Sequence, residues 1–307
     1  MLSALLVSAL VAFPKPGMKL PYVERAYMIG AVEPGVTNLV VQGRPVEVYR
    51  TGAWATMVDV TPGTNEIELA VGDFKTNHVF TVGAKPQPRD PSLPPPPEKK
   101  WEKLAYAGDV PKAHPSGKAP GEITVTVDPG HGGSETGAYA PHGYMEKNAN
   151  LLVSLELRKA LEKRGYKVVM TRETDKTVPL YDRPKVAHAA GADAFISVHH
   201  NAPPANADPR TVRYTCAYSW NPLGEKLAAA LNARVASAFE GEIPSHGTLH
   251  ANFAVTRNPE IPSALVEIDF LTSPEGEEAV FDLARIAHVA EALADGFADW
   301  CATGSEP

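Results

Sequence analysis

Cysteine is scarce in this chain, with only Cys216 and Cys301 among its 307 residues. No Cys-x-x-Cys pair is present, so a zinc site built on paired thiolates is excluded. Two isolated cysteines neither require nor exclude a disulfide, and such residues are most often buried small side chains. Structural cross-linking by several disulfides is therefore not the way this chain is stabilised.

An excess of positive charge is also missing. The chain has 29 Lys and Arg against 36 Asp and Glu, which gives a net charge of -7 and a pI of about 5.8. This balance argues against a nucleic-acid-binding protein and against simple electrostatic attachment to an anionic lipid or polymer. Contact with such material would require specific pockets.

Apolar runs of membrane-spanning length are absent too. The apolar segment near the N-terminus, residues 2–13, is too short to cross a bilayer as a helix, so we expect no integral membrane span. It is typical of the apolar region of a secretory signal, with small residues near Ala9 or Ala12 as a candidate cleavage site, although no Lys or Arg precedes it. We therefore expect residues 1–20 to be a leader or N-terminal segment and the protein to be exported, to the periplasm, the cell envelope or the extracellular space. A plain N-terminal strand is the alternative.

Proline, in contrast, is concentrated at one place. The segment "AKPQPRDPSLPPPPEKK", residues 84–100, contains four consecutive prolines. Proline fixes its backbone angle and cannot donate to a β-ladder, so this segment predicts an extended polyproline spacer. We place a linker at residues 84–121, between an N-terminal domain and a second domain at residues 122–302.

The N-terminal domain, residues 21–83, contains short strand-like segments separated by Gly and Pro turns. This pattern predicts a small all-β sandwich. His78 is its lone histidine, so we expect an accessory module without chemistry of its own. The turn spacing resembles that of immunoglobulin-like accessory domains of secreted bacterial carbohydrate-active enzymes. The six expected strands are residues 25–32, 37–43, 45–50, 54–61, 65–71 and 77–82.

In residues 122–302 strands alternate with helices. This order predicts an α/β fold, with a mostly parallel open sheet flanked by helices on both faces. The expected strands are residues 123–128, 167–172, 193–200, 211–220 and 263–270. The expected helices are residues 148–166, 180–191, 222–239 and 282–300.

Polar residues gather where the strands of this domain end. His131 follows the first strand in "VDPGHGG", His199 and His200 end the third in "SVHHNA", and Glu267 lies in the last, "LVEIDF". Glu146 precedes the first helix. Ligands of open α/β sheets bind outside the carboxyl ends of the strands. Two histidines and a glutamate as ligands, with a second glutamate as general base, match a catalytic zinc site.

The motifs "DPGHGG", "EKNANL", "RGYKVVMTR", "FISVHHNA" and "LVEIDFLTSPEGEE" resemble those of the zinc-dependent N-acetylmuramoyl-L-alanine amidases, the amidase type 3 family. The resemblance runs from about Ile123 to Trp300. It implies hydrolysis of the amide that joins the lactyl group of N-acetylmuramic acid to L-alanine in peptidoglycan. It also implies His131, Glu146 and His199 as ligands of Zn²⁺, and Glu267 as the catalytic acid and base.

The same resemblance guides the choice among neighbouring residues. In the family motif the first histidine is the ligand, which selects His199, and strand alternation sends His200 to the opposite face. His142 lies in a "PHG" turn and is expected to face solvent or substrate. Asn201 is a candidate for orienting substrate. Arg257 is a candidate for binding a stem-peptide carboxylate, with pairing to a surface acid as the equal alternative.

Two further expectations follow from the resemblance. Some amidases of this class carry an inserted helix that plugs the zinc site, but residues 203–250 are filled here by one predicted strand and one helix. We therefore expect an open site that needs no activator, in a monomeric protein. Glu135 is read as the acidic residue that the family often has after its Gly-rich turn.

Two other functions fit parts of the pattern. A zinc peptidase of carboxypeptidase type, acting within stem peptides, also uses two histidines and two glutamates. Its first two ligands usually lie in an H-x-x-E motif, whereas His131 and Glu146 are fifteen residues apart. A non-catalytic peptidoglycan-binding protein is the other alternative, and the presence of all four site residues argues against it.

Overall fold

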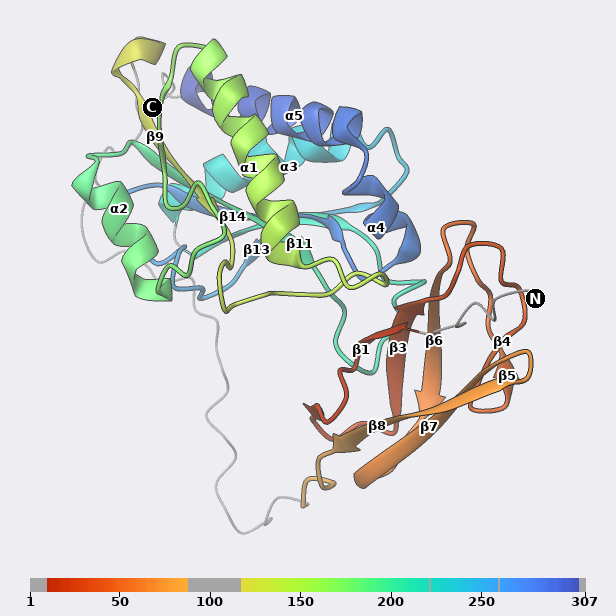
Figure 1. Cartoon of the computed structure of the whole chain (residues 1–307). Coiled ribbons are helices and arrows are strands. Elements are labelled where there is room, and N and C mark those ends of the chain that lie inside the picture. Colours follow the sequence, from red (N-terminus) through yellow and green to blue (C-terminus); the bar gives the residue numbers. More distant parts are fainter. Residues whose placement is uncertain (1–9, 88–116, 221, 259, 304–307) are drawn as a thin grey trace.

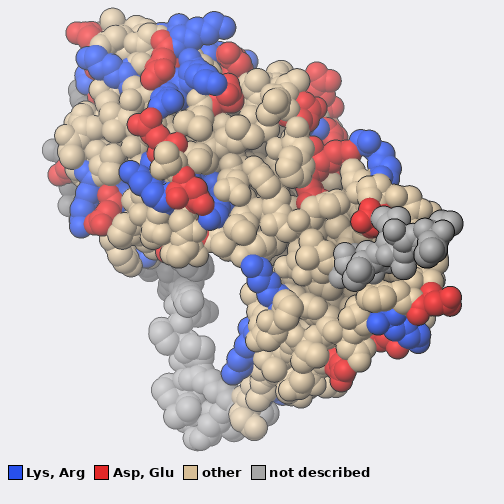
Figure 2. Space-filling view, viewed as in Figure 1, with Lys and Arg blue, Asp and Glu red and all other residues tan. Residues whose placement is uncertain are grey.

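The computed structural model describes residues 10–87, 117–220, 222–258 and 260–303, which form an all-β domain followed by a larger α/β domain (Figure 1). The first nine residues of the expected leader and most of the expected Pro-rich linker lie outside the described residues. On the face shown in Figure 2, acidic and basic side chains are interspersed over both domains.

The N-terminal domain consists of two β-sheets that enclose a common core. One sheet has the strand order β1-β3-β6 and the other β2-β8-β7-β4-β5. In β7, Ile67 and Leu69 are buried while Glu66 and Glu68 are exposed, because alternate side chains of a strand point to opposite faces. The strands are Leu10–Phe13 (β1), Lys19–Leu20 (β2), Arg25–Ala31 (β3), Leu39–Val41 (β4), Arg44–Pro45 (β5), Ala53–Asp59 (β6), Gly63–Val71 (β7) and Phe74–Val82 (β8).

The N-terminal edge of this domain differs from the expectation. Strand β1 pairs antiparallel with β3, and β2 pairs with β8, so residues 10–20 belong to the β-domain rather than to a separate segment. Ala12 is buried within β1, and cleavage there would divide the strand. The strand expected at residues 45–50 is mostly absent: β5 ends at Pro45, and Val48 makes only an isolated bridge to Trp54.

The second domain is built on a six-stranded sheet with the order β10-β9-β11-β14-β12-β13. All neighbouring strands are parallel except β12 and β14, which confirms the predicted mostly parallel α/β fold. Its strands are Thr124–Pro129 (β9), Lys167–Met170 (β10), Ala194–Asn201 (β11), Thr215–Ser219 (β12), Ser245–His250 (β13) and Ser263–Phe270 (β14).

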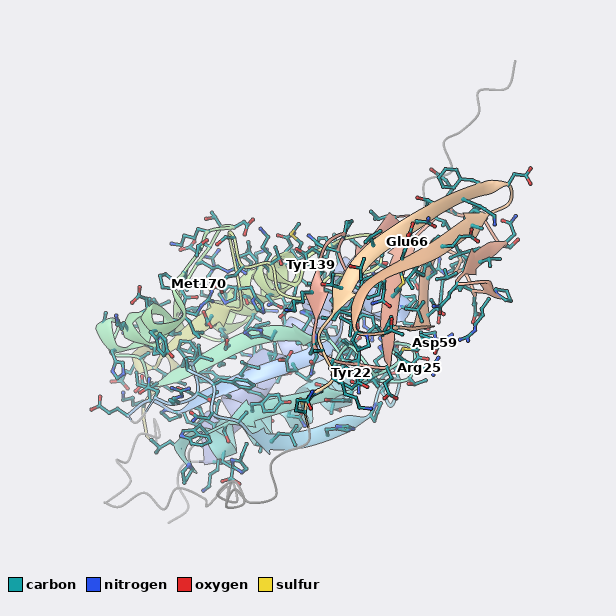
Figure 3. The ribbon with its side chains drawn as sticks, turned by 90° about the horizontal axis from the view of Figure 1, so that it is seen from below. Tyr22, Arg25, Asp59, Glu66, Tyr139 and Met170 are labelled. Carbon is teal, nitrogen blue, oxygen red and sulfur yellow. The ribbon has the colours of Figure 1, made fainter. Side chains whose placement is uncertain are left out.

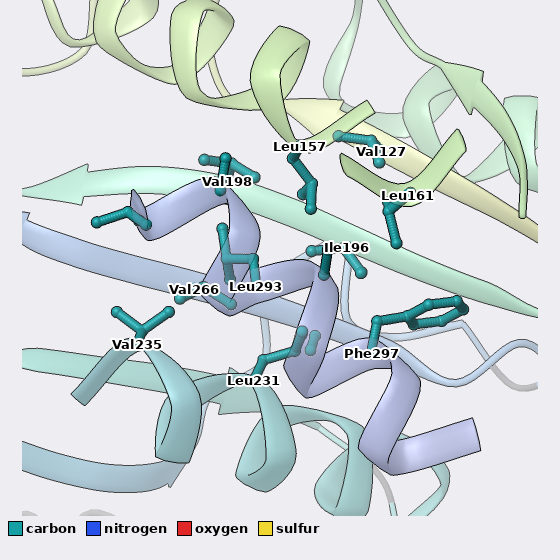
Figure 4. Close-up of a cluster of buried hydrophobic side chains, with 14 of the residues drawn as sticks. Val127, Leu157, Leu161, Ile196, Val198, Leu231, Val235, Val266, Leu293 and Phe297 are labelled. Atoms are coloured by element: carbon teal, nitrogen blue, oxygen red, sulfur yellow. The ribbon is translucent and has the colours of Figure 1, made fainter. Parts of the chain in front are cut away.

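Helices cover both faces of this sheet. Helices α1, α3 and α5 pack together on one face and α2 lies on the other (Figure 1). The main core lies under the three helices, where Leu157, Leu231 and Phe297 meet Ile196 and Val266 of the central strands (Figure 4). The helices are Glu146–Lys163 (α1), Arg183–Ala189 (α2), Pro222–Ala238 (α3), Pro274–Ala279 (α4) and Leu283–Ala302 (α5), with short 3₁₀ turns at Pro120–Glu122 (η1) and Leu180–Asp182 (η2).

Strand β13 and helix α4 were not predicted. The β13 sequence, "SHGTLH", is polar and half-exposed because it forms the edge of the sheet, so it lacks an apolar signal. The interval from Pro203 to His250 thus holds two strands and one helix, not one of each. In the described part of that interval, α3 is the only helix.

Cys216 is buried in β12 and Cys301 is half-buried in α5, and both thiols are free.

Among the described residues, none of the helices combines the length and apolar character that crossing a bilayer would require.

Candidate active site

Three predicted ligands converge at the carboxyl edge of the sheet. His131 follows β9, Glu146 is the first residue of α1, and His199 lies near the end of β11. One ligand atom from each lies within 4.8 Å of the others. His131 Nε2 is 3.2 Å from Glu146 Oε2, and His199 Nδ1 is 3.0 Å from Glu146 Oε1. The carboxylate therefore lies between the two imidazoles.

Glycines make this approach possible. A Cβ atom on Gly130 would lie 2.2 Å from the imidazole ring of His199, and one on Gly137 would lie 2.3 Å from Glu146 Oε2. Both distances are far below van der Waals contact, so only glycine fits at these positions. The Gly-rich segment after β9 thus gives the ligands room as well as turning the chain.

Glu146 is held as a carboxylate by its surroundings. Glu146 is only 4% exposed. Its two carboxylate oxygens accept hydrogen bonds from the Ala138 backbone amide (2.9 Å), the Asn150 side-chain amide (3.0 Å) and the His200 backbone amide (3.3 Å). Burial alone would raise the pKa of Glu146. The contacts to His131 and His199 outweigh burial and hold that pKa well below its usual range.

The two adjacent histidines of β11 have opposite environments. Burial acts to lower the pKa of His199, but the contact with Glu146 outweighs it and raises that pKa. His200 is also buried, and desolvation lowers its pKa to about 4. Its Nδ1 lies 2.9 Å from Asn150 Oδ1, on the far side of the strand from the three-residue cluster. The His200 side chain therefore reaches Glu146 through Asn150, while the His200 backbone amide donates to Glu146 Oε1 directly (3.3 Å).

Glu267 stands next to the cluster. In the parallel ladder of β11 and β14 it pairs with His199, and its Oε2 atom is buried without a hydrogen-bond partner among the described residues. Burial, together with the charge of Glu146, raises the pKa of Glu267 to about 7, although His199 acts to lower it. The site thus contains two carboxylates whose pKa values are pushed in opposite directions, which is the arrangement of a fixed charge and a proton carrier.

A cleft of about 360 Å³ opens over these residues. Its lining combines charged and imidazole side chains with the apolar Leu180 and Phe253, which are 48% and 40% exposed. The combination suits a substrate with both polar and apolar surface. The lining residues are Asp128, His131, Glu135, Leu180, Arg183, His199, Phe253, Ala254, Val255, Leu265 and Glu267.

The remaining sequence candidates lie outside this lining. Asn201 Oδ1 accepts a hydrogen bond from the Ala202 amide (2.8 Å), and exposed Arg257 donates to the Asn252 carbonyl (3.2 Å). His142 lies 2.7 Å from Glu277, and its Nε2 lies 3.1 Å from the Thr51 carbonyl, so it belongs to the boundary between the domains. Its side chain is also 38% exposed, which agrees with the expectation that it faces solvent.

Asp128 and Arg183 are the buried residues that the sequence analysis missed. Arg183 Nη1 lies 2.8 Å from Asp128 Oδ1, and this ion pair sits beneath the cleft. The other Asp128 oxygen accepts a hydrogen bond from Ser197 Oγ (2.7 Å), and Arg183 also donates to the His131 carbonyl (2.7 Å). In the sequence they are an arginine near the start of a predicted helix and an aspartate at a strand end. Neither feature by itself predicts a buried ion pair.

The donor set fits a zinc ion. Two imidazoles and one carboxylate are the ligands of catalytic zinc sites that keep a position open for water. Outer hydrogen bonds orient the carboxylate, as Asn150 and Ala138 do for Glu146. The cluster also faces the cleft through His131 and His199, so a bound ion would be reached by a substrate.

The pKa of Glu267 leads to a prediction for the metal-free protein. Its folded-state pKa of about 7 lies above the 4.5 of an ordinary glutamate, so folding favours the protonated acid, and this stabilisation is lost as the pH rises from 4.5 through 7. Between pH 5 and pH 8 we expect Glu267→Gln to gain roughly 2 kcal/mol in free energy of unfolding relative to the wild type, after allowance for partial exposure. Urea unfolding in the presence of a chelator measures this difference. A pH-independent difference would show that the carboxyl group titrates normally.

The sequence and the fold were compared with known proteins. The family model described as N-acetylmuramoyl-L-alanine amidase matches residues 125–299. The chain is 36% identical over 176 residues to the probable cell wall amidase LytH of Staphylococcus epidermidis, a match that covers 56% of each chain. It is 30% identical over 242 residues to the N-acetylmuramoyl-L-alanine amidase AmiA of Escherichia coli, covering 63% of this chain and 80% of the relative.

Solved structures give the same picture of the second domain. The amidase AmiC2 of Nostoc punctiforme is 31% identical and superposes with a TM-score of 0.55, over 58% of this chain and 97% of that one. The catalytic domain of CwlV from Paenibacillus polymyxa is 28% identical, with a TM-score of 0.54 over 58% and 97% of the two chains. The chain spans little more than half the length of the staphylococcal relative.

Proposed function

The chain belongs to the N-acetylmuramoyl-L-alanine amidase family, and on this basis we propose that it is a zinc-dependent hydrolase of peptidoglycan. The bond cleaved is the amide between the lactyl group of N-acetylmuramic acid and L-alanine of the stem peptide. The observation that carries the proposal is the convergence of His131, Glu146 and His199 at a cleft that His131, His199 and Glu267 line.

Each residue of the site has a separate task in this reaction. His131, Glu146 and His199 would hold the zinc ion, which would supply Lewis acidity to the water and to the amide carbonyl. Glu267 takes a proton from the attacking water and gives it to the nitrogen of the leaving L-alanine. A pKa of about 7 suits both transfers, because the group ionises and is protonated again near neutral pH.

The surroundings of the site support the rest of the proposal. The cleft presents Leu180 and Phe253 beside polar groups, which suits a glycan with an attached peptide. One relative is named a probable cell wall amidase and another an N-acetylmuramoyl-L-alanine amidase, so we place the site of action outside the cytoplasm, with peptidoglycan as the partner. We also propose that the protein acts as a monomer. We further propose that it needs no activator, because α3 is the only helix in the described part of residues 203–250.

A digest of purified peptidoglycan tests the proposal. We expect the zinc-loaded protein to release intact stem peptides with free L-alanine amino termini, as read by mass spectrometry. A chelator should abolish the release, and added zinc should restore it. Peptides trimmed within their own chain would instead identify a zinc peptidase. Binding of peptidoglycan without any release would identify a binding protein or one that needs an activator.

A further inference from the structure

The N-terminal domain touches the two loops that leave the carboxyl edge of the catalytic sheet. One loop, residues 132–145, connects His131 to Glu146, and the other, residues 202–214, follows His199 and Asn201 along the chain. Figure 1 shows both loops reaching from the α/β domain to strands β1 and β3. The two domains therefore meet at the side of the molecule where the metal ligands lie.

The first loop is anchored through Tyr139. The ammonium group of Lys15 lies 3.9 Å from the centroid of the Tyr139 ring, a distance typical of a cation–π contact. The same ring packs against a cluster on the outer face of the β1-β3-β6 sheet, which includes Phe13, Tyr27 and Ile29. Figure 3 places Tyr139 at the boundary between the domains.

Tyr139 is linked to Glu146 by short backbone steps. It forms a β-bridge with Met145, the residue immediately before the ligand. Its neighbour Ala138 exchanges two hydrogen bonds with Glu146: the Ala138 amide donates to Glu146 Oε2 (2.9 Å), and the Glu146 amide donates to the Ala138 carbonyl (2.9 Å). A shift of Tyr139 would therefore move a donor that orients the ligand carboxylate.

The second loop is held by backbone pairing and packing. The Tyr27 amide of β3 donates to the Ala205 carbonyl (2.9 Å), and Ala205 packs against the core of the N-terminal domain. A third contact lies beside the first loop, where exposed Arg50 pairs with Glu278 of α4. The contacts thus come from separate elements of the catalytic domain, and they restrain both chain segments that adjoin the ligands.

We propose that the N-terminal domain is a structural part of the metal site, and that Tyr139 is the positioning residue through which it acts. The domain holds the 132–145 loop, the loop holds the Ala138 amide, and the amide fixes the carboxylate of Glu146. This inference rests on the proposed zinc function for its effect on affinity. Its effect on the order of the loop is independent of that function.

The test uses the full chain and compares Tyr139→Ala with Tyr139→Phe and Tyr22→Ala. Tyr139→Phe keeps the ring under Lys15 but removes the hydroxyl that interacts with Lys15 and Thr136, so it separates the contribution of the ring from that of the hydroxyl. Tyr22→Ala is the matched control, because Tyr22 lies under Lys85 at 5.7 Å within the N-terminal domain. Zinc affinity is measured by competition with a chelator, and hydrogen exchange of residues 136–148 is measured in metal-free protein.

We expect Tyr139→Ala to lower zinc affinity by about 10- to 100-fold, the usual effect of losing a group that orients a ligand. It should also speed exchange in residues 136–148, while Tyr22→Ala changes neither quantity. Unchanged affinity and unchanged exchange in Tyr139→Ala would overturn the inference. A wild-type chain that binds no zinc would refute the proposed function, and the exchange measurement would still decide the role of Tyr139.

A second variant guards against misfolding of Tyr139→Ala. Lys15→Met removes only the cation above the ring, and Lys85→Met is its control within the N-terminal domain. We expect Lys15→Met to speed exchange in residues 136–148 by a few fold and Lys85→Met to leave it unchanged. Equal exchange in the two lysine variants would count against the anchoring role of the domain.

Discussion

Replacing Glu267 by glutamine is expected to lower the rate of peptidoglycan hydrolysis by about 10²- to 10⁴-fold, the usual contribution of a general acid and base. The glutamine side chain has nearly the same shape but carries no proton that it can exchange with water. Glu267 pairs with His199 across the ladder and lines the cleft, so no other carboxylate of the cleft floor has the same position. Release of stem peptides over time measures the loss.

Two controls separate this effect from damage to the fold. Zinc affinity and peptidoglycan binding of Glu267→Gln should stay close to the wild-type values, because the residue is not one of the three ligands. Glu260→Gln changes an exposed glutamate seven residues earlier and should keep full activity. Substantial turnover by Glu267→Gln, above a tenth of the wild-type rate, would move the acid and base role to another residue.

Replacing Glu146 by glutamine is expected to abolish activity and to lower zinc affinity by more than about 100-fold, beyond the range seen for outer groups that only orient a ligand. The substitution removes the negative charge that both histidines contact. It also puts an amide NH₂ where one oxygen now accepts hydrogen bonds from Ala138 or from Asn150 and His200. Chelator competition and the peptide-release assay measure the two losses.

The control for Glu146→Gln comes from the same helix. Glu156 lies ten residues further along α1 and pairs with Lys159 at the surface. Glu156→Gln should therefore retain zinc affinity and turnover. Normal zinc binding by Glu146→Gln would show that the carboxylate is not a ligand, even though it lies between the two imidazoles.

Much of the fold of the catalytic domain could be predicted from the sequence, because its helices and strands have clear hydrophobic patterns. Helix α1 places Val153, Leu157 and Leu161 on one buried face, and in β14 the carboxylate of Glu267 directly follows an apolar run, so it stood out. Alternation along β11 separated His199 from His200, and the structure places the two on opposite faces. These features are local, so the sequence alone contains them.

The parts that were missed depend on tertiary context. Strand β13 is a polar sheet edge, and β1 was read as part of a leader because its short apolar run fits both structures. Arg257 and Asn201 were chosen by their place next to motifs, whereas the walls of the cleft come from Leu180 and Phe253, which no motif marked. The contact of Tyr139 with the N-terminal domain joins residues more than a hundred positions apart, and no local pattern encodes it.

The two free thiols have a consequence for redox sensitivity and for handling of the protein. Burial raises the pKa of both the Cys216 thiol and the Cys301 thiol to about 12, so neither forms an appreciable amount of thiolate near neutral pH. The thiolate is the form that is oxidised and that binds metals. The protein should therefore keep its activity in oxidising and reducing surroundings alike. It can be purified without thiol reductants, which would themselves compete with His131, Glu146 and His199 for zinc.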